Sequence, residues 1–350
     1  MTSENDHIVR DDGCESADLY EHFRFDVARG QAILRIDKYL AGKLENTSRS
    51  RVQAAALAGN ILVNQVPVKS NYRVKPGDTI SIVLAYPRHE YEIIPENIPI
   101  DFLYQDEDLV VINKAAGMVV HPGLGNYSGT LIHALAYHLK DSPLFTPGDY
   151  RPGLVHRLDK MTSGVMVIAK NEISQAHLAK QFYERTIERR YIALVWGNLE
   201  KDEGTITGNI GRNPKDRTKM HVFDDDSQGK YAVTHYRVME RLGYVNLVEC
   251  RLETGRTHQI RVHFRQIRHP VFGDTEYGGD KILRGTTHQH YKQFIHHCFQ
   301  IMPRQALHAV SLGFIHPRTG KNMLFETSLP ADMNEVLEKW RNYIAGRTTV

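Results

Sequence analysis

A polar stretch followed directly by an apolar one constrains this chain more than any other feature. Residues 153–164 read G-L-V-H-R-L-D-K-M-T-S-G, and residues 165–169 read V-M-V-I-A. Short apolar runs bounded by turn residues are typical of buried strands, so Asp159 is expected in a tight loop at a strand edge, where reactive groups often lie. Arg157 and Lys160 flank Asp159 and favour its ionised form. These residues alone fit a catalytic carboxylate and a solvated surface ion pair about equally well.

The run G-L-V-H-R-L-D-K-x-T-S-G resembles the signature of the RluA-type pseudouridine synthases. In that family the aspartate of H-R-L-D is the catalytic nucleophile, and the resemblance gives this role to Asp159. It also implies that His156 and Arg157 contact RNA, with Arg157 filling the gap that a displaced base leaves.

Two later runs extend the resemblance. The run R-x-Y-x-A-x-V-x-G resembles the family motif that carries the active-site tyrosine, here Tyr191, which would otherwise be read as a core aromatic. The run T-G-R-T-H-Q-I-R-V-H resembles the motif whose arginine after Q-I pairs with the catalytic aspartate, and that arginine is Arg261. The same run implies RNA contacts for Arg256 and His258.

Residues 31–88 are expected to form a separate small unit of two helices followed by a sheet. Ser48 fits the N-cap of a helix over residues 49–58. The words R-I-D-K-Y-L, S-R-S-R-V, G-N-I-L-V-N and V-K-P-G-D-T-I resemble the S4 RNA-binding domain. The resemblance implies that Arg49 and Arg51 meet structured RNA, and a basic helix face that is merely solvated is the alternative.

Charge is distributed unevenly along the chain. Residues 1–30 hold 3 Lys/Arg against 8 Asp/Glu, residues 31–88 hold 9 against 3, and the other 262 residues hold 32 against 30. A basic unit beside a near-neutral body is a weak indication of nucleic-acid binding. Residues 1–30 are expected to be an acidic flexible tail, and the proline-containing residues 89–99 a linker.

Residues 100–350 are expected to form the catalytic domain. The resemblance implies an α+β fold, with a mixed, mainly antiparallel sheet, flanking helices and an RNA cleft across the middle. Thr257 fits the N-cap of a helix, and the polar segment 201–231 fits an RNA-facing hairpin or a solvated loop. The histidine-rich segment 280–304 lacks a convincing metal-ligand spacing and is expected to be a mostly solvated insertion. The patterns also predict strands at 109–114, 165–170, 189–197 and 245–252, and helices at 174–185 and 330–343.

The three cysteines show no disulfide or metal-site spacing, and the chain lacks a signal-peptide pattern and an apolar run of membrane-spanning length. A reducing cytoplasm is therefore expected. The resemblance implies an isomerase that needs no cofactor and no metal, and we expect it to act as a monomer.

The word V-V-H-P-G-L-G-N together with an S4-like unit looks most like the RluD-type branch of the family. Its members convert uridine to pseudouridine in a stem-loop (helix 69) of large-subunit (23S) ribosomal RNA, so ribosomal RNA or a pre-50S particle is the implied partner. A tRNA-directed synthase and a non-catalytic ribosome-assembly factor are the alternatives. A hydrolase that uses Asp159 would lack a nucleophile elbow or a metal-ligand set.

Overall fold

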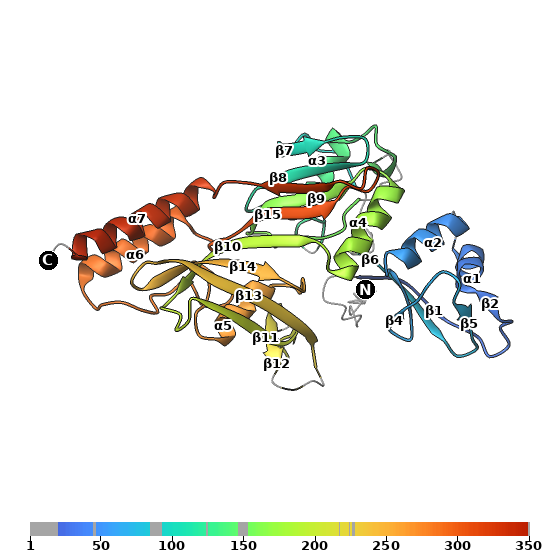
Figure 1. The fold of residues 1–350 in the computed structure, drawn as a ribbon, viewed down its shortest axis with the longest axis horizontal. Coiled ribbons are helices and arrows are strands. Elements are labelled where there is room, and N and C mark those ends of the chain that lie inside the picture. Colours follow the sequence, from blue (N-terminus) through green and yellow to red (C-terminus); the bar gives the residue numbers. More distant parts are fainter. Residues whose placement is uncertain are drawn as a thin grey trace, which may run out of the picture.

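The computed structural model describes residues 20–44, 47–84, 93–123, 125–145, 153–216, 218–223, 225 and 228–348. Figure 1 shows a small unit at one end, a sheet-based body in the middle, and the helices α6 (Gln289–Ile301) and α7 (Ala331–Thr348) at the other end. Within the described residues, no helix combines the length and the apolar character needed to cross a membrane.

The small unit contains a four-stranded antiparallel sheet of order β1-β6-β3-β4, a two-stranded sheet of β2 and β5, and two helices. Its own core joins Ile36 and Leu40 of the first helix to Ile61 and Ile80 of the larger sheet. The elements are β1 (Tyr20–Asp26), β2 (Leu34–Arg35), α1 (Ile36–Lys43), α2 (Arg49–Leu57), β3 (Ile61–Val63), β4 (Val66–Pro67), β5 (Arg73–Val74) and β6 (Thr79–Leu84).

Helix α2 begins where the sequence predicts. The Ser48 hydroxyl accepts a hydrogen bond from the backbone N–H of Arg51 at 3.3 Å, which satisfies one of the donors left free at a helix start. Gly59 follows the helix with a φ of +74°, a conformation that glycine adopts without steric cost. The predicted cap and the predicted helix are therefore confirmed.

Strand β1 shows that the predicted flexible tail is wrong for residues 20–26. These residues pair with β6, and Phe25 packs against the core of the small unit. Phe23 and Phe25 alternate with polar residues, and alternation with a period of two is typical of a strand. A bulge between Glu21 and Phe23 interrupts this alternation. The acidic composition of the segment conceals this short pattern. Residues 1–19 lie outside the described residues.

The body is built on a ten-stranded mixed sheet of order β12-β11-β13-β14-β10-β15-β9-β8-β7, with β16 paired to β15. Neighbouring strands are antiparallel except β9 and β15, which run parallel. This confirms the expected mixed, mainly antiparallel sheet. The strands are β7 (Asp101–Gln105), β8 (Leu109–Lys114), β9 (Ser163–Ala169), β10 (Glu188–Trp196), β11 (Glu203–Arg212), β12 (Met220–Phe223), β13 (Lys230–Arg241), β14 (Val245–Leu252), β15 (Leu307–Ile315) and β16 (Asn322–Glu326).

Helices flank this sheet. Helix α4 (Glu172–Glu184) contacts β9 and β15 of the body and also α2 of the small unit. Helix α5 (Gln259–Gln266) contacts β11, β12 and β13. The remaining helical segments are α3 (Leu131–His138) and the 3-10 turn η1 (Pro143–Phe145). The strands and helices predicted from hydrophobic patterns correspond to β8, β9, β10, β14, α4 and α7, with shifts of a few residues at their ends.

The predicted start of α5 is wrong by one residue. His258, not Thr257, is the N-cap, and its backbone is left-handed with a φ of +54°. The Gln259 side chain accepts a hydrogen bond from the backbone N–H of Arg256 at 2.9 Å, and the Gln259 N–H donates to the Arg256 carbonyl at 3.1 Å. This tight turn moves the cap beyond Thr257.

The histidine-rich segment 280–304 is more than a solvated insertion. It contains α6, whose Tyr291, Ile295 and Cys298 side chains are buried in the main core. These three residues recur at intervals of three or four positions, so they form one apolar face of the helix, and this face packs against the core. The prediction of solvent exposure holds for the histidines themselves. The exposed ones are His288, His290, His296 and His297.

Residues 93–99, the described part of the expected linker 89–99, lie against the body. They contain no helix or strand, but Ile93 is buried in the main core. The backbone N–H of Glu96 donates to the His133 carbonyl at 3.0 Å, and the Glu96 carboxylate accepts a hydrogen bond from the Gly129 N–H at 2.9 Å. These contacts hold the segment against the body, so a free linker is the wrong description for it.

Candidate active site

A cleft of about 1210 Å³ lies between the small unit and the body, and most of the predicted site residues line it. The strands and loops of both units contribute side chains to it. The predicted residues among them are His156, Arg157, Asp159, Tyr191, Arg256, His258 and Arg261. Arg49 and Arg51 are not among the lining residues.

The close contact of β9 with β15 positions the Asp159 loop. Gly164 in β9 has a φ of +125°, and a Cβ at this position would lie 2.2 Å from the carbonyl oxygen of Ala309 in β15. Only glycine permits so close an approach of the two backbones. The loop itself is closed by a hydrogen bond from the Thr162 N–H to the Asp159 carbonyl at 3.1 Å. Asp159 therefore stands in a tight loop directly before strand β9, as the sequence predicts.

Asp159 faces Arg261 and His258. Arg261 Nη1 donates to Asp159 Oδ2 at 3.1 Å, and His258 Nε2 lies 3.9 Å from Asp159 Oδ1. Burial raises the pKa of the Asp159 carboxyl, but His258, Arg261 and Arg157 together hold that pKa below its ordinary value. Burial also lowers the pKa of the neighbouring His258. The Asp159 carboxylate is ionised at neutral pH.

Three other side chains orient Arg261. Its Nε donates to Asp274 Oδ2 at 2.7 Å, and its Nη2 donates to Asp274 Oδ1 at 3.0 Å and to Glu276 Oε2 at 2.7 Å. Its guanidinium carbon lies 4.9 Å from the centre of the Tyr277 ring. The Arg261 side chain is 4% exposed and that of Asp274 is 0% exposed. This arrangement fixes the guanidinium plane and directs Nη1 at Asp159.

Asp274, Glu276 and Tyr277 were not predicted as site residues. They lie in the run F-G-D-T-E-Y-G-G, whose polar residues between glycines indicate a turn with a specific role. Asp274 Oδ1 also accepts hydrogen bonds from the backbone N–H groups of Glu276 and Tyr277, both at 3.1 Å. The turn therefore places its carboxylates on Arg261, a pairing that sequence spacing does not reveal.

His258 belongs to the same network. Its Nδ1 lies 2.9 Å from the Tyr277 hydroxyl oxygen and 3.4 Å from Glu276 Oε2. Its left-handed backbone at the start of α5 directs the ring toward Asp159. The residue predicted as an RNA contact therefore lies directly beside the carboxylate.

Tyr191 is held in the middle of the sheet. It lies on β10, opposite Cys250 of β14 and Ala309 of β15, and is 9% exposed. Ala309 is the residue that meets Gly164 of β9, so the same strand contact positions both Tyr191 and the Asp159 loop. Both side chains line the cleft.

The two residues that precede Asp159 in its loop have different environments. The Arg157 guanidinium donates to the Tyr20 hydroxyl and lies 5.5 Å from the centre of the Tyr20 ring. The His156 ring stacks on Phe182 at 4.6 Å, and its Nε2 accepts a hydrogen bond from the Val167 N–H at 3.1 Å. Burial, aided by the charge of Arg189, lowers the pKa of His156 to about 3. His156 is therefore a neutral side chain that anchors the loop.

The three other predicted RNA contacts have protein partners. Arg49 Nη2 lies 2.9 Å from Oδ2 of the buried Asp37. Arg51 Nη2 lies 2.7 Å from Oε1 of Glu172, the first residue of α4. Arg256 Nε donates to the Tyr231 carbonyl at 3.3 Å. Contact of these arginines with RNA stays a prediction.

Comparisons with known proteins give the family. The RNA pseudouridylate synthase family matches residues 108–266, and the S4 domain matches residues 34–80. An uncharacterized RNA pseudouridine synthase of Chlorobaculum parvum is 48% identical over 318 residues, which are 90% of this chain and 97% of that protein. The chain belongs to the RNA pseudouridine synthase family. The predicted family and enzyme class, an RNA-modifying isomerase, are thereby confirmed.

Two further members of this family are similar over most of their length. The ribosomal large subunit pseudouridine synthase D of Zymomonas mobilis is 41% identical over 301 residues, which cover 85% of this chain and 91% of that protein. The solved structure of human RNA pseudouridylate synthase domain containing 4 covers 69% of this chain and 93% of its own, with 26% identity and a TM-score of 0.55. The predicted combination of a pseudouridine synthase domain with an N-terminal S4 domain is confirmed.

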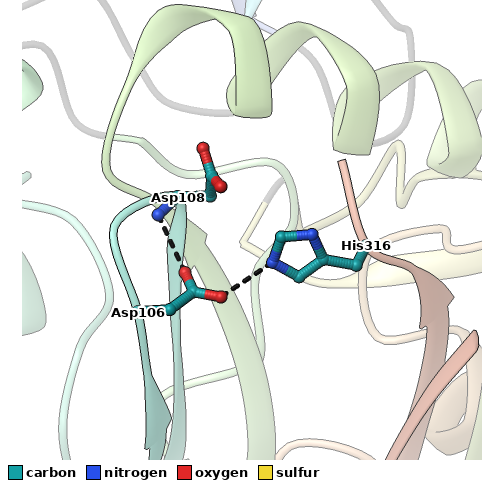
Figure 2. A group of neighbouring side chains, drawn as sticks. All are labelled: Asp106, Asp108 and His316. Carbon is teal, nitrogen blue, oxygen red and sulfur yellow. Dashed lines mark hydrogen bonds and ion pairs between the residues drawn. The ribbon is translucent and has the colours of Figure 1, made fainter. Parts of the chain in front are cut away.

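A group of acidic residues and a histidine lies away from the synthase cleft. Asp106, Asp108 and His316 have ligand atoms close enough to surround a metal ion (Figure 2). Asp106 Oδ1 accepts a hydrogen bond from the Asp108 N–H at 2.8 Å, and Asp106 Oδ2 lies 2.7 Å from His316 Nε2. Arg318 Nε lies 2.7 Å from Asp108 Oδ2 and supplies positive charge. The group therefore joins the β7–β8 turn to the loop that follows β15.

Proposed function

We propose that the protein converts uridine to pseudouridine in large-subunit ribosomal RNA, with the helix 69 stem-loop as its target. The observation that carries the proposal is the ionised Asp159 carboxylate, held by Arg261 in a cleft rich in cationic side chains. Relatives named ribosomal large subunit pseudouridine synthase D, about 41% identical to this chain, support the choice of RNA. The word V-V-H-P-G-L-G-N supports the choice of stem-loop.

The charge of the cleft suits RNA. Eight cationic and three acidic side chains are among its lining residues. Lysine and arginine displace counterions from phosphates, and this release is a main source of RNA affinity. The cationic residues are Arg24, Arg157, Arg185, Arg189, Arg212, Lys230, Arg256 and Arg261, and the acidic ones are Glu21, Asp159 and Glu253.

The target base leaves its stack before the reaction. Extruding a base costs about a few kcal/mol, and less in a loop than in a duplex. Arg157 lies two residues before Asp159 on the same loop, so it is close to the position that the base vacates. We propose that Arg157 leaves Tyr20 and fills this gap in the RNA.

Asp159 acts on the sugar. The reaction breaks the N1–C1′ bond and joins C5 of the same base to C1′. The carboxylate either attacks C1′ as a nucleophile or removes a proton from C2′ to give a glycal, and both routes need it ionised. Arg261 maintains this charge and orients the carboxylate. These contacts are compatible with both routes.

Tyr191 acts on the base. Its ring lines the cleft and stacks on the extruded uracil, and its hydroxyl assists removal of the C5 proton. The C5 proton is lost while N1 gains one, so the nucleotide keeps its composition and no electron is transferred. We therefore propose a cofactor-free reaction. We also propose that the enzyme acts as a monomer in the cytoplasm.

Mapping of pseudouridines in total RNA tests the proposal. Cells with and without the gene are compared, and the missing sites identify the target. We expect loss of pseudouridine only in the helix 69 region of large-subunit ribosomal RNA. Loss at tRNA positions would favour a tRNA-directed enzyme. An unchanged map with defective large subunits would favour a non-catalytic assembly factor and overturn the proposal.

A further inference from the structure

Helix α2 of the S4 domain contacts helix α4 of the body. Arg51 Nη2 and Nε lie 2.7 and 3.1 Å from the two carboxylate oxygens of Glu172, at the start of α4. At the other end of α2, the Tyr183 ring of α4 packs so closely on Gly59 that a Cβ there would lie 2.7 Å from the ring. Contacts at both ends of α2 therefore fix the S4 domain to α4.

The sheet of the S4 domain presents its other face to the cleft. Ile80 and Ile82 of β6 lie in the core of the small unit, while Ser81 between them lines the cleft. Asn64 and Gln65 form the turn between β3 and β4, in left-handed conformations with φ of +50° and +68°, and also line it. Arg24 of β1 reaches the same face with a side chain that is 57% exposed, and its Nη1 lies 3.9 Å from Oε1 of Glu21, which also lines the cleft.

We propose that the RNA passes between this sheet face of the S4 domain and the catalytic domain, while α2 serves as the docking helix. The proposal rests on the proposed function, because it takes the occupant of the cleft to be substrate RNA. On this face Arg24 lies beside Glu21 among neutral polar side chains, and Arg185 and Lys230 line the body side of the cleft, so cationic side chains face a polyanion from both sides. In this arrangement Arg51 affects RNA binding through the position of the S4 domain.

A charge swap between Arg51 and Glu172 tests the docking role. Affinity for an in vitro transcript of large-subunit ribosomal RNA is measured at fixed salt for Arg51→Glu, Glu172→Arg and the double variant. Each single variant places like charges together and should weaken binding by about two- to fivefold, the range expected for an exposed ion pair. The double variant restores the pair and should bind within about twofold of wild type.

Glu172→Arg alone separates docking from direct contact. It replaces a negative charge with a positive one and so raises the net charge by two, and binding would strengthen if Arg51 and its surroundings simply met phosphates. Glu184→Arg makes the same change at the far end of α4, where Glu184 pairs only weakly with Lys180 at 3.7 Å, and serves as the control. Stronger binding by Glu172→Arg, or no recovery in the double variant, would overturn the docking role. Thermal melts establish that each variant is folded.

Arg24→Glu tests whether RNA binds to the sheet face of the S4 domain or to its helices. Lys38 on α1 is exposed and outside the cleft, so Lys38→Glu applies the same charge change to another face of the same domain. We expect Arg24→Glu to weaken binding more than Lys38→Glu and to lower the salt slope by about 1. The reverse order would place RNA on the helices and overturn the proposal. If the wild type forms no pseudouridine at all, the proposed function fails instead.

Discussion

Arg261 and Asp159 are separated by 102 positions in the sequence, yet Arg261 Nη1 donates to Asp159 Oδ2 at 3.1 Å. The guanidinium does not move freely to this carboxylate, because Asp274 and Glu276 hold its other nitrogens. The pair therefore combines a fixed cation with a partly exposed carboxylate that opens to the RNA cleft.

Arg261→Lys should lower the rate of pseudouridine formation by about 10- to 100-fold, because one charge-assisted hydrogen bond is worth about 1.5–3 kcal/mol. Lysine keeps the charge but cannot hold Asp274 through two nitrogens while also reaching Asp159. Single-turnover assays at saturating RNA measure the effect, with RNA affinity as the control. A wild-type rate would show that the guanidinium geometry is not needed.

Asp274→Ala should reduce the free energy of unfolding by about 3–5 kcal/mol, since it leaves Arg261 buried without its main partner. Glu276→Ala is the matched control, because Glu276 contacts the same guanidinium but is 44% exposed, and it should cost about 0–1 kcal/mol. Urea unfolding of both variants measures the difference. Equal losses of unfolding free energy in the two variants would mean that burial of the Arg261–Asp274 pair does not determine how much the pair stabilises the fold.

Acid should destabilise the protein through His156. Burial lowers its pKa to about 3, whereas an unfolded histidine has a pKa of about 6.5. Between these values the unfolded chain binds a proton that the folded protein does not, so the unfolding free energy falls as pH decreases. His156→Gln cannot titrate and should lose less stability than wild type between pH 6.5 and about 4.5. Parallel pH profiles would contradict the low pKa.

Tyr191→Phe keeps the aromatic ring and removes the hydroxyl. If the hydroxyl assists proton removal from C5, the rate of the chemical step should fall by about 100-fold or more, while RNA affinity stays within about twofold. Single-turnover rates and binding constants measured on one RNA separate the two effects. Tyr191→Ala should also weaken binding, because the stacking surface is lost. A normal rate for Tyr191→Phe would limit Tyr191 to stacking.

Local patterns predicted the parts of the fold that local physics decides. Ser48 caps α2, and the apolar run after Asp159 is strand β9. The roles of Tyr191 and Arg261 came only from family motifs, because a tyrosine in a strand and an arginine in a helix are ordinary residues. Both lie in the cleft with Asp159, although their catalytic roles are still proposals.

Tertiary contacts decided what the sequence could not predict. The pairing of Arg261 with Asp274 depends on how α5 packs against the turn that follows it. The pairing of Arg51 with Glu172 joins two domains across 121 positions. The β1 strand was missed because β6, its partner, begins more than fifty residues later. Such pairings carry no local signal.

Asp159→Asn tests the central claim most directly. Asparagine has nearly the same shape, and Arg261 keeps Asp274 and Glu276, so the fold and RNA binding should persist. The measurement is the amount of pseudouridine formed in a large-subunit ribosomal RNA transcript by purified wild type and by Asp159→Asn at equal RNA occupancy. We expect pseudouridine with the wild type and none with the variant. Full turnover by Asp159→Asn would remove the carboxylate from the reaction and contradict the account.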